Sequence, residues 1–189
     1  MENTVSGEKQ IVNVKQLALT GLMTAVLCIL SPFALHIPFS PVPISLGFLA
    51  IYFVTAVSGL KIGTASVFIY ILLGLVGVPV FTDFTAGPGK LLGPTGGYII
   101  GYLFMAPICG FFADRFRKRP LFCVPGMILG TCTCYLFGTL WLGRQMNLSF
   151  PQALLTGVVP YLPGDVVKLA LALVIGSQIR RRLNRAGII

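Results

Sequence analysis

Gly59-Leu60-Lys61-Ile62 interrupts an apolar stretch that otherwise runs from residue 44 to residue 78. A helix that spans a membrane needs about 20 residues. A single span could not accommodate about 35 residues without a large tilt. We therefore interpret this stretch as two short helices, residues 44–58 and 63–78, which are joined by the four-residue turn.

Four further apolar segments lie outside this stretch, at residues 14–30, 96–113, 121–142 and 165–179. Of all residues, 56% are hydrophobic and only 10% are charged, whereas about a quarter of the residues of a soluble domain are charged. The sequence therefore predicts an all-α membrane protein with six transmembrane helices. It forms a single domain, residues 1–189, with a polar N-terminal tail at residues 1–12.

The distribution of basic residues predicts the orientation of this protein in the membrane. With both termini in the cytoplasm, 11 of the 14 Lys and Arg residues fall in inner segments, Lys90 and Arg144 in outer loops, and Lys168 in the sixth helix. This is the positive-inside bias of a multi-pass membrane protein. A five-helix topology would place one of the clusters at residues 115–119 and 180–185 outside. The same distribution argues against nucleic-acid binding, because basic residues fall in short clusters between apolar runs.

Asp165 and Lys168 form the ionisable pair that this topology places within the membrane. Their i, i+3 spacing puts them on one face of the sixth helix. With Arg180 as the inner boundary, they lie about 8 and about 12 Å below the outer surface of a core about 30 Å thick. Ionisable groups at such depth usually face a cavity or a partner, so a ligand site is favoured. The alternative is that Asp165 is a helix N-cap, which Lys168 neutralises.

Three outer loops, residues 31–43, 79–97 and 144–164, are long and rich in Pro and Gly. Non-helical backbone at membrane depth is tolerated only where it is buried in protein or lines a cavity. The loops therefore predict an outer ligand pocket with a lid, although they can also be ordinary connectors. In the second loop, Thr95 can cap the fourth helix, whose N-terminal N–H groups favour an anion, and Lys90 adds a positive charge.

The first helix carries small residues on one side, with Ala18, Gly21 and Ala25 at spacings i, i+3 and i+7. Small residues allow helices in lipid to approach one another closely. This face is equally suited to a partner subunit and to the other helices of the chain.

Several classes of function are disfavoured by what the sequence lacks. It has no carboxylate cluster, no set of metal ligands, no Ser/His arrangement and no phosphate-binding loop of the Gly-x-x-x-x-Gly-Lys-Ser/Thr type. The five cysteines lie within apolar runs, where they behave as small hydrophobic residues. We therefore expect no enzymatic activity, no cofactor and no metal, and we assign no metal or base role to His36.

Four stretches together resemble one known family. They are residues 42–46 (Val-Pro-Ile-Ser-Leu), residues 74–81 (Gly-Leu-Val-Gly-Val-Pro-Val-Phe), residues 92–98 (Leu-Gly-Pro-Thr-Gly-Gly-Tyr) and residues 163–168 (Pro-Gly-Asp-x-x-Lys). They look like the BioY family, the biotin-binding S components of energy-coupling-factor (ECF) transporters. The chain departs from many members at Gly47, where they have Gln, and at residues 82–84, where they have a Gly-rich run.

The resemblance implies a six-helix S component in a prokaryotic plasma membrane, with a biotin pocket near the outer face. It also implies coupling to a transmembrane T subunit, which would dock on the small-residue face of the first helix, and to two cytosolic ATPases. An S component for another small vitamin and a stand-alone secondary transporter are the alternatives.

Roles for individual residues follow from the chemistry of biotin. Asp165 can accept hydrogen bonds from the two ureido N–H groups, and Lys168 can donate one to the ureido carbonyl or neutralise Asp165. Lys90 and the N-terminus of the fourth helix can bind the carboxylate. The other candidates are an acidic residue that replaces a lost polar contact and three aromatic residues that enclose the ring system: Asp83, Phe81, Phe84 and Tyr98.

Overall fold

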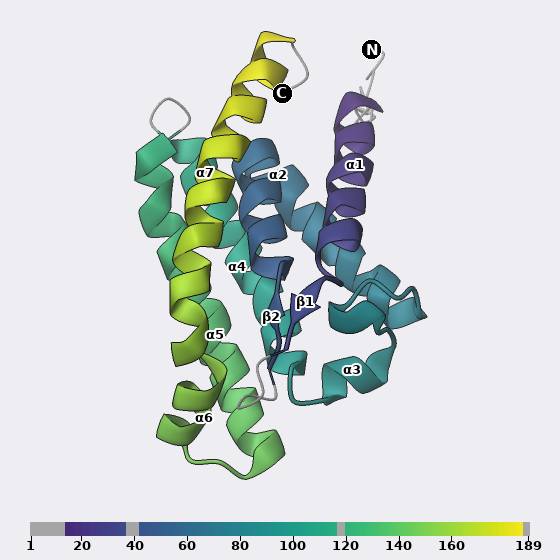
Figure 1. The fold of residues 1–189 in the computed structure, drawn as a ribbon. Helices are drawn as coiled ribbons and strands as arrows, with labels where there is room; N and C mark the ends of the chain where they lie inside the picture. Colours follow the sequence, from purple (N-terminus) through teal and green to yellow (C-terminus); the bar gives the residue numbers. More distant parts are fainter. Residues whose placement is uncertain (1–13, 37–41, 117–119, 187–189) are drawn as a thin grey trace, which may run out of the picture.

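The computed structural model describes residues 14–36, 42–116 and 120–186. The polar tail predicted at residues 1–12 lies outside these residues. The described part is almost entirely helical (Figure 1). Its elements are, in chain order, α1 (Val14–Leu30), β1 (Ala34–Leu35), β2 (Ile44–Ser45), α2 (Gly47–Val76), the 3₁₀ turn η1 (Thr82–Phe84), α3 (Pro88–Leu92), α4 (Gly96–Arg115), η2 (Pro120–Cys123), α5 (Val124–Met146), α6 (Phe150–Gly157), η3 (Val159–Tyr161) and α7 (Leu162–Arg185).

The predicted all-α membrane fold is confirmed. The six predicted segments correspond to α1, the two halves of α2, α4, α5 and α7. Within the described residues, four stretches are long and apolar enough to cross a membrane, namely Gly47–Val76, Gly96–Arg115, Leu121–Met146 and Phe150–Arg185, and Val14–Leu30 is a shorter apolar helix. The short helices α3 and α6 and the strand β1 lie in the loops that were predicted to be long and irregular, whereas β2, the antiparallel partner of β1, takes up the first two residues of the predicted helix 44–58.

The turn at residues 59–62 is sharper than the sequence predicts. Gly59 alone breaks the helix, with φ 77° and ψ −162°, a conformation open essentially only to glycine. Beyond it, the second half of α2 runs back behind the first (Figure 1). A Cβ at Gly59 would lie 2.2 Å from the Asp114 Oδ1 atom. The Leu60 N–H donates to Asp114 Oδ2 over 2.8 Å, so a carboxylate from α4 caps the second half of α2.

α4 is the central helix, packed against both α2 and α5, while α1 and α7 pack on α2. The approach of α4 to α2 is close. A Cβ at Gly110 would lie 2.6 Å from the Cα atom of Leu60. Small residues allow such close packing, which is the main source of helix association in lipid.

The small-residue face of α1 points away from the rest of the chain. Ala18, Gly21 and Ala25 are exposed, and a Cβ at Gly21 would meet no atom within 4 Å. The opposite face, with Leu19, Met23, Thr24 and Leu27, is buried. Within the described residues, the predicted small face therefore does not pack against the protein's own helices.

α7 is longer than the predicted segment 165–179, and it begins at Leu162 with Tyr161 as its N-cap. Pro163 and Gly164 were expected to end the preceding segment. Instead they form part of the first turn of α7, where proline is tolerated because its missing N–H would have no helical partner. Asp165 therefore lies inside the helix, and the alternative that it is the N-cap is wrong.

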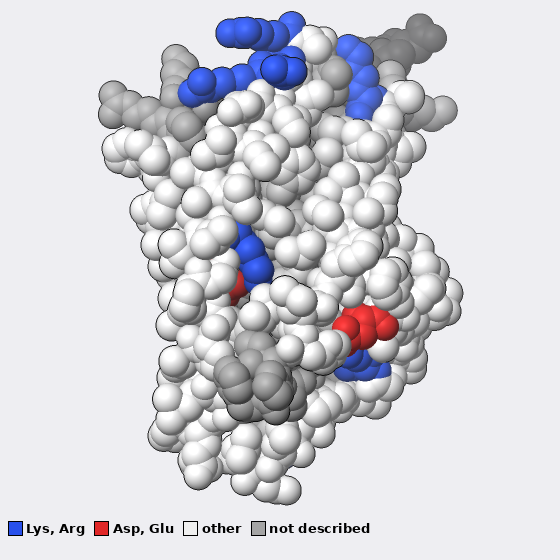
Figure 2. Space-filling model, viewed as in Figure 1, with Lys and Arg blue, Asp and Glu red and all other residues white. Residues whose placement is uncertain are grey.

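Lys and Arg side chains gather at the end of the molecule where α1 begins and α7 ends (Figure 2). Arg180, however, is not a surface residue at this inner end, because only 6% of it is exposed. Its guanidinium donates to the carbonyls of Ala56 and Ala113, each over 3.1 Å, and pairs with Asp114 over 2.5 Å. Arg180 thus ties α7 to α2 and α4.

Candidate functional site

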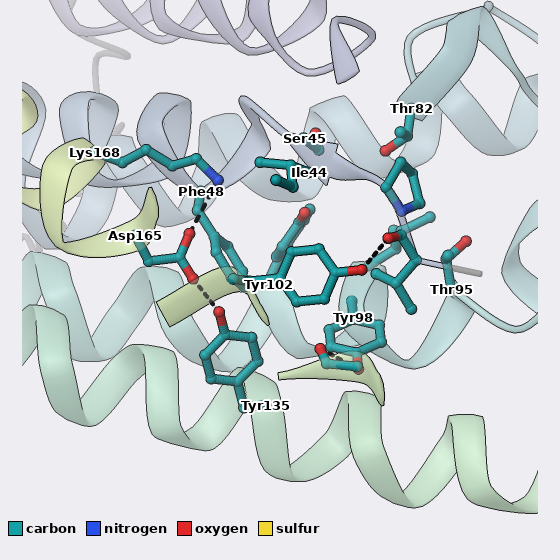
Figure 3. A pocket seen from close by; sticks show the side chains of 15 residues that line it. Ile44, Ser45, Phe48, Thr82, Thr95, Tyr98, Tyr102, Tyr135, Asp165 and Lys168 are labelled. Atoms are coloured by element: carbon teal, nitrogen blue, oxygen red, sulfur yellow. Dashed lines mark hydrogen bonds and ion pairs between the residues drawn. The ribbon is translucent and has the colours of Figure 1, made fainter. Parts of the chain in front are cut away.

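A cavity lies at the outer half of the molecule, where α7 begins and α2 and α4 start (Figure 3). Its empty volume is about 500 Å³, including the part open to the outside, which is within the range of small-molecule sites. The residues that line it are Val42, Pro43, Ile44, Ser45, Phe48, Thr82, Thr95, Tyr98, Ile99, Tyr102, Tyr135, Gly157, Tyr161, Asp165 and Lys168.

Asp165 is the polar centre of one end of the cavity. Its carboxylate lies between the Lys168 ammonium and the Tyr135 hydroxyl (Figure 3). Lys168 Nζ is 2.9 Å from Oδ1, and the Tyr135 hydroxyl of α5 donates to Oδ2. The side chains of Asp165 and Lys168 are only 7% and 10% exposed. The first turn of α7 therefore presents a buried, oriented ion pair to the cavity.

This ion pair retains hydrogen-bonding capacity for a ligand. A carboxylate has about four lone-pair sites and an ammonium has three N–H donors. Among the described residues, Asp165 accepts two hydrogen bonds and Lys168 donates one. A ligand with adjacent N–H and C=O groups would complete both side chains at once.

Aromatic rings form the wall beside the ion pair. Phe48 of α2 meets Tyr102 of α4 and Tyr135 of α5 edge to face, with ring centroids 5.7 and 5.4 Å apart. Tyr98 meets Tyr135 in the same way at 6.4 Å. The Lys168 Nζ atom lies 5.9 Å from the centroid of Phe48, within cation–π distance. The wall is thus apolar and rigid, and it suits a flat ring system.

Hydroxyl groups line the other end of the cavity (Figure 3). Thr82 is the first residue of the turn η1, and Thr95 occupies the N-cap position of α4. The sequence predicts a capping role for Thr95, but its side chain makes no capping hydrogen bond. The Thr95 side chain is instead part of the cavity lining, next to the N-terminus of a 20-residue helix. This end can receive an anion.

The loops around the cavity are fixed by hydrogen bonds from buried tyrosines. The Tyr98 hydroxyl donates to the Gly157 carbonyl over 3.0 Å, and the Tyr161 hydroxyl donates to the Val42 carbonyl. Ser45 donates to the Ser31 carbonyl over 3.0 Å. These bonds connect α4, α6 and the strand β2, so irregular backbone at this depth lines a cavity, as its polar groups require.

Four of the eight predicted ligand-binding residues meet in this cavity, namely Asp165, Lys168, Thr95 and Tyr98. The other four, Phe81, Asp83, Phe84 and Lys90, are not part of its lining.

The backbone of η1 explains the placement of two of these residues, Asp83 and Phe84. Asp83 and Phe84 adopt left-handed conformations, with φ 63° and 53°, and Thr82 is the residue of this turn that faces the cavity. Asp83 instead lies 3.2 Å from the His36 imidazole. Phe84 is exposed and packs edge to face on Phe33. Phe81 is fully buried in the core against Tyr70.

Two cavity residues, Phe48 and Tyr135, are not predicted from the sequence. Tyr135 is the only tyrosine of the apolar helix α5, 30 positions from Asp165, and no local motif connects the two. Phe48 follows the resembling stretch at residues 42–46 and is indistinguishable from a lipid-facing phenylalanine. Only the packing of α2 against α4 and α5 brings both residues to the site.

The chain is similar to known proteins over nearly its whole length. A family model described as the BioY family matches residues 2–185. A probable biotin transporter BioY of Pyrococcus horikoshii is 34% identical over 166 residues, covering 88% of this chain and 96% of the relative. Biotin transporter BioY2 of Lactococcus lactis is 32% identical, covering 89% and 91%. A crystal structure of the S-component for biotin from an ECF-type ABC transporter superposes with a TM-score of 0.82 at 33% identity, covering 89% and 92%.

Proposed function

The chain belongs to the BioY family, and from this premise we propose that it is the biotin-binding S component of an ECF-type importer, with the outer cavity as its binding site. It is a multi-pass membrane protein of a transporter family and not an enzyme. The observation that carries the assignment of the site is the buried group of Asp165, Lys168 and Tyr135 at the end of an aromatic-walled cavity.

The polar end of the cavity matches the ureido ring of biotin. Two ureido N–H groups need an acceptor, which the carboxylate of Asp165 supplies. The ureido carbonyl needs a donor, which the ammonium of Lys168 supplies. Tyr135 positions the carboxylate, because its hydroxyl holds the Oδ2 atom. Charge-assisted hydrogen bonds of this kind are about twice as strong as neutral ones.

The fused rings and the carboxylate tail of biotin match the aromatic wall and the hydroxyl-lined end of the cavity. The fused rings and sulfur are apolar and fit against Phe48, Tyr98 and Tyr102. The carboxylate tail reaches the opposite end, where Thr82 and Thr95 offer hydroxyls and the N-terminus of α4 favours negative charge. Lys90 lies on α3 outside the cavity lining, so its proposed role is a long-range attraction of the anion.

Transport requires partners, and the outward face of α1 is the proposed contact with the T subunit. Ala18, Gly21 and Ala25 leave this face flat and exposed, which supports close packing by a helix of another subunit. Two cytosolic ATPases would then supply the energy. We propose that the chain itself holds no cofactor and no metal, and that ATP acts only in the partners.

A binding competition tests the substrate. The purified chain is titrated with labelled biotin, and unlabelled biotin, thiamine and riboflavin compete. Biotin alone should displace the label, because neither competitor has a cyclic urea with two N–H groups for Asp165. Displacement by thiamine or riboflavin at similar concentrations would assign the chain to another vitamin. Uptake with and without the ATPase module, in cells lacking other importers, then separates an S component from a stand-alone transporter.

A further inference from the structure

A second pocket lies at the inner end of the molecule and shares no lining residue with the outer cavity. Its empty volume is about 420 Å³, including the part open to the outside. It lies between α7, the part of α2 just before the Gly59 kink, the end of α4, and η2. The proposed function gives this pocket no role.

The pocket is electropositive. Arg180 and Arg181 line it, and none of its described lining residues is acidic. Asp114 pairs with Arg180 but also accepts the Leu60 N–H at the turn of α2. One carboxylate therefore serves two donors, and Arg181 adds a second positive charge. Arg182 and Arg185 in the last turn of α7 strengthen the positive potential around the pocket.

Arg180 also has an unused donor. The NH1 group donates to two backbone carbonyls and the NH2 group donates to Asp114. The buried Nε atom has no hydrogen-bond partner among the described residues. A buried guanidinium N–H without a partner is costly, and an anion in this pocket would lower that cost.

The lining changes from polar to apolar along the membrane normal. On α7, the polar residues Asn184 and Arg181 lie toward the inner surface, followed by Ser177 one turn deeper than Arg181 and Leu173 two turns deeper. Phe116 and Cys123 add apolar surface from the ends of α4 and η2. A ligand that fits has a negatively charged head toward the cytoplasm and an apolar body toward the membrane core.

We propose that this inner pocket binds the phosphate group of an anionic phospholipid of the inner leaflet. The headgroup phosphate contacts Arg181 and is attracted by the positive charge of Arg180. The glycerol and upper acyl chain lie along Ser177 and Leu173. Basic pockets between transmembrane helices on the cytoplasmic side are suited to such headgroups. A free phosphate ion shares the headgroup chemistry but would leave the apolar part of the pocket empty.

Native mass spectrometry of the purified chain tests this proposal through three titrations, with phosphatidylglycerol, phosphatidylcholine and inorganic phosphate. Phosphatidylglycerol should bind with an affinity at least about tenfold above that of phosphatidylcholine, because phosphatidylcholine has the same phosphate but adds a choline cation, which the surrounding arginines repel. Tighter binding of phosphatidylglycerol than of inorganic phosphate identifies the lipid as the source of the phosphate. Equal binding of the two would overturn the lipid assignment.

The variants Arg181→Gln and Arg182→Gln provide a matched pair. Both remove one exposed charge from adjacent positions of α7, but only Arg181 lines the pocket. Arg181→Gln should weaken phosphatidylglycerol binding about twentyfold, whereas Arg182→Gln should weaken it by at most about fivefold through loss of general attraction. Equal losses would show diffuse surface binding and overturn the proposal.

Ser177→Leu supplies a further check that leaves every charge in place. The larger side chain fills the pocket where the apolar body of the lipid should lie, and it is well tolerated in a membrane helix. Loss of phosphatidylglycerol binding with unchanged biotin affinity is the expected result. Retention of full lipid binding would contradict the placement of the lipid along this face of α7.

Discussion

Two ion pairs, one at each end of the molecule, use the same chemistry for different purposes. The outer pair, Asp165 and Lys168, lies within one turn of α7 and faces a cavity. The inner pair, Asp114 and Arg180, joins two helices, and most of its remaining donors and acceptors are used by backbone groups of α2 and α4.

A binding pair can be distinguished from a structural pair by the partners of its remaining hydrogen bonds. A pair with unused hydrogen-bonding capacity toward a cavity can bind a ligand. A pair that joins two helices and whose other bonds go to backbone atoms of α2 and α4 holds the fold. Loss of the outer pair should therefore affect ligand affinity, and loss of the inner pair should affect stability.

Arg180→Met should have the largest effect, on stability. It leaves the buried carbonyls of Ala56 and Ala113 without their donor, and it removes the cation that pairs with the partly exposed Asp114 carboxylate. We expect the free energy of unfolding to fall by roughly 2–4 kcal/mol, mainly from the two unsatisfied carbonyls, measured by thermal and denaturant unfolding in detergent. Arg182→Met, an exposed neighbour, is the control and should change little. Biotin affinity per folded molecule should stay within about twofold of the original. Equal stability of the two variants would remove the structural role of the inner pair.

Removal of both outer charges should give the next largest effect, on binding. Asp165→Leu combined with Lys168→Met leaves no unpaired charge behind, so the free energy of unfolding should change by less than about 1 kcal/mol. Biotin affinity should fall at least about 30-fold, measured by calorimetry. If the double variant bound biotin normally, the outer cavity would not be the site.

Tyr135→Phe should have a smaller effect on the same site. It removes the hydroxyl that positions Asp165 but keeps the aromatic ring that packs on Phe48. Loss of one hydrogen bond to a charged group should weaken biotin binding about tenfold. Tyr102→Phe is the matched control, because this tyrosine lines the same wall and makes no hydrogen bond to Asp165. The positioning role of Tyr135 predicts that its variant loses more affinity than the control.

Lys90→Gln should have the smallest effect. Lys90 lies on α3 outside the cavity lining, and a distant, partly exposed charge contributes little to affinity. Biotin affinity should change by less than about twofold. The association rate should fall modestly, and this fall should become smaller as the salt concentration rises. A loss of tenfold or more would show that α3 moves to bring Lys90 onto the ligand.

The sequence predicts the helices and the outer ion pair because both depend on local information. Apolar length defines a transmembrane helix, and charge is so rare in this chain that Asp165 and Lys168 stand out. The start of α7 was misplaced because Pro163 is compatible with both the end of a loop and the first turn of a helix. Local sequence does not separate these two cases.

The rest of the site depends on packing between distant segments. Tyr135 and Phe48 reach the cavity only because α5 and α2 pack on α4. Conversely, Phe81, Asp83 and Phe84 were expected at the cavity but do not line it. They lie at the end of the family-like stretch 74–81 or shortly after it. The left-handed residues of η1 direct two of them elsewhere, and the sequence does not reveal that turn.

The bend at Gly59 also has a consequence for how the protein enters the membrane. The first half of α2, Gly47 to Ser58, is about 12 residues long, and so rises only about 18 Å, too little to cross a core of about 30 Å. It therefore cannot stop in the translocon as an independent span. Both halves must leave the insertion channel together as a hairpin, with the Leu60 N–H awaiting its cap from Asp114. Asp114 can provide that cap only after α4 has been synthesised, so the inner end of the molecule is completed in the order of synthesis.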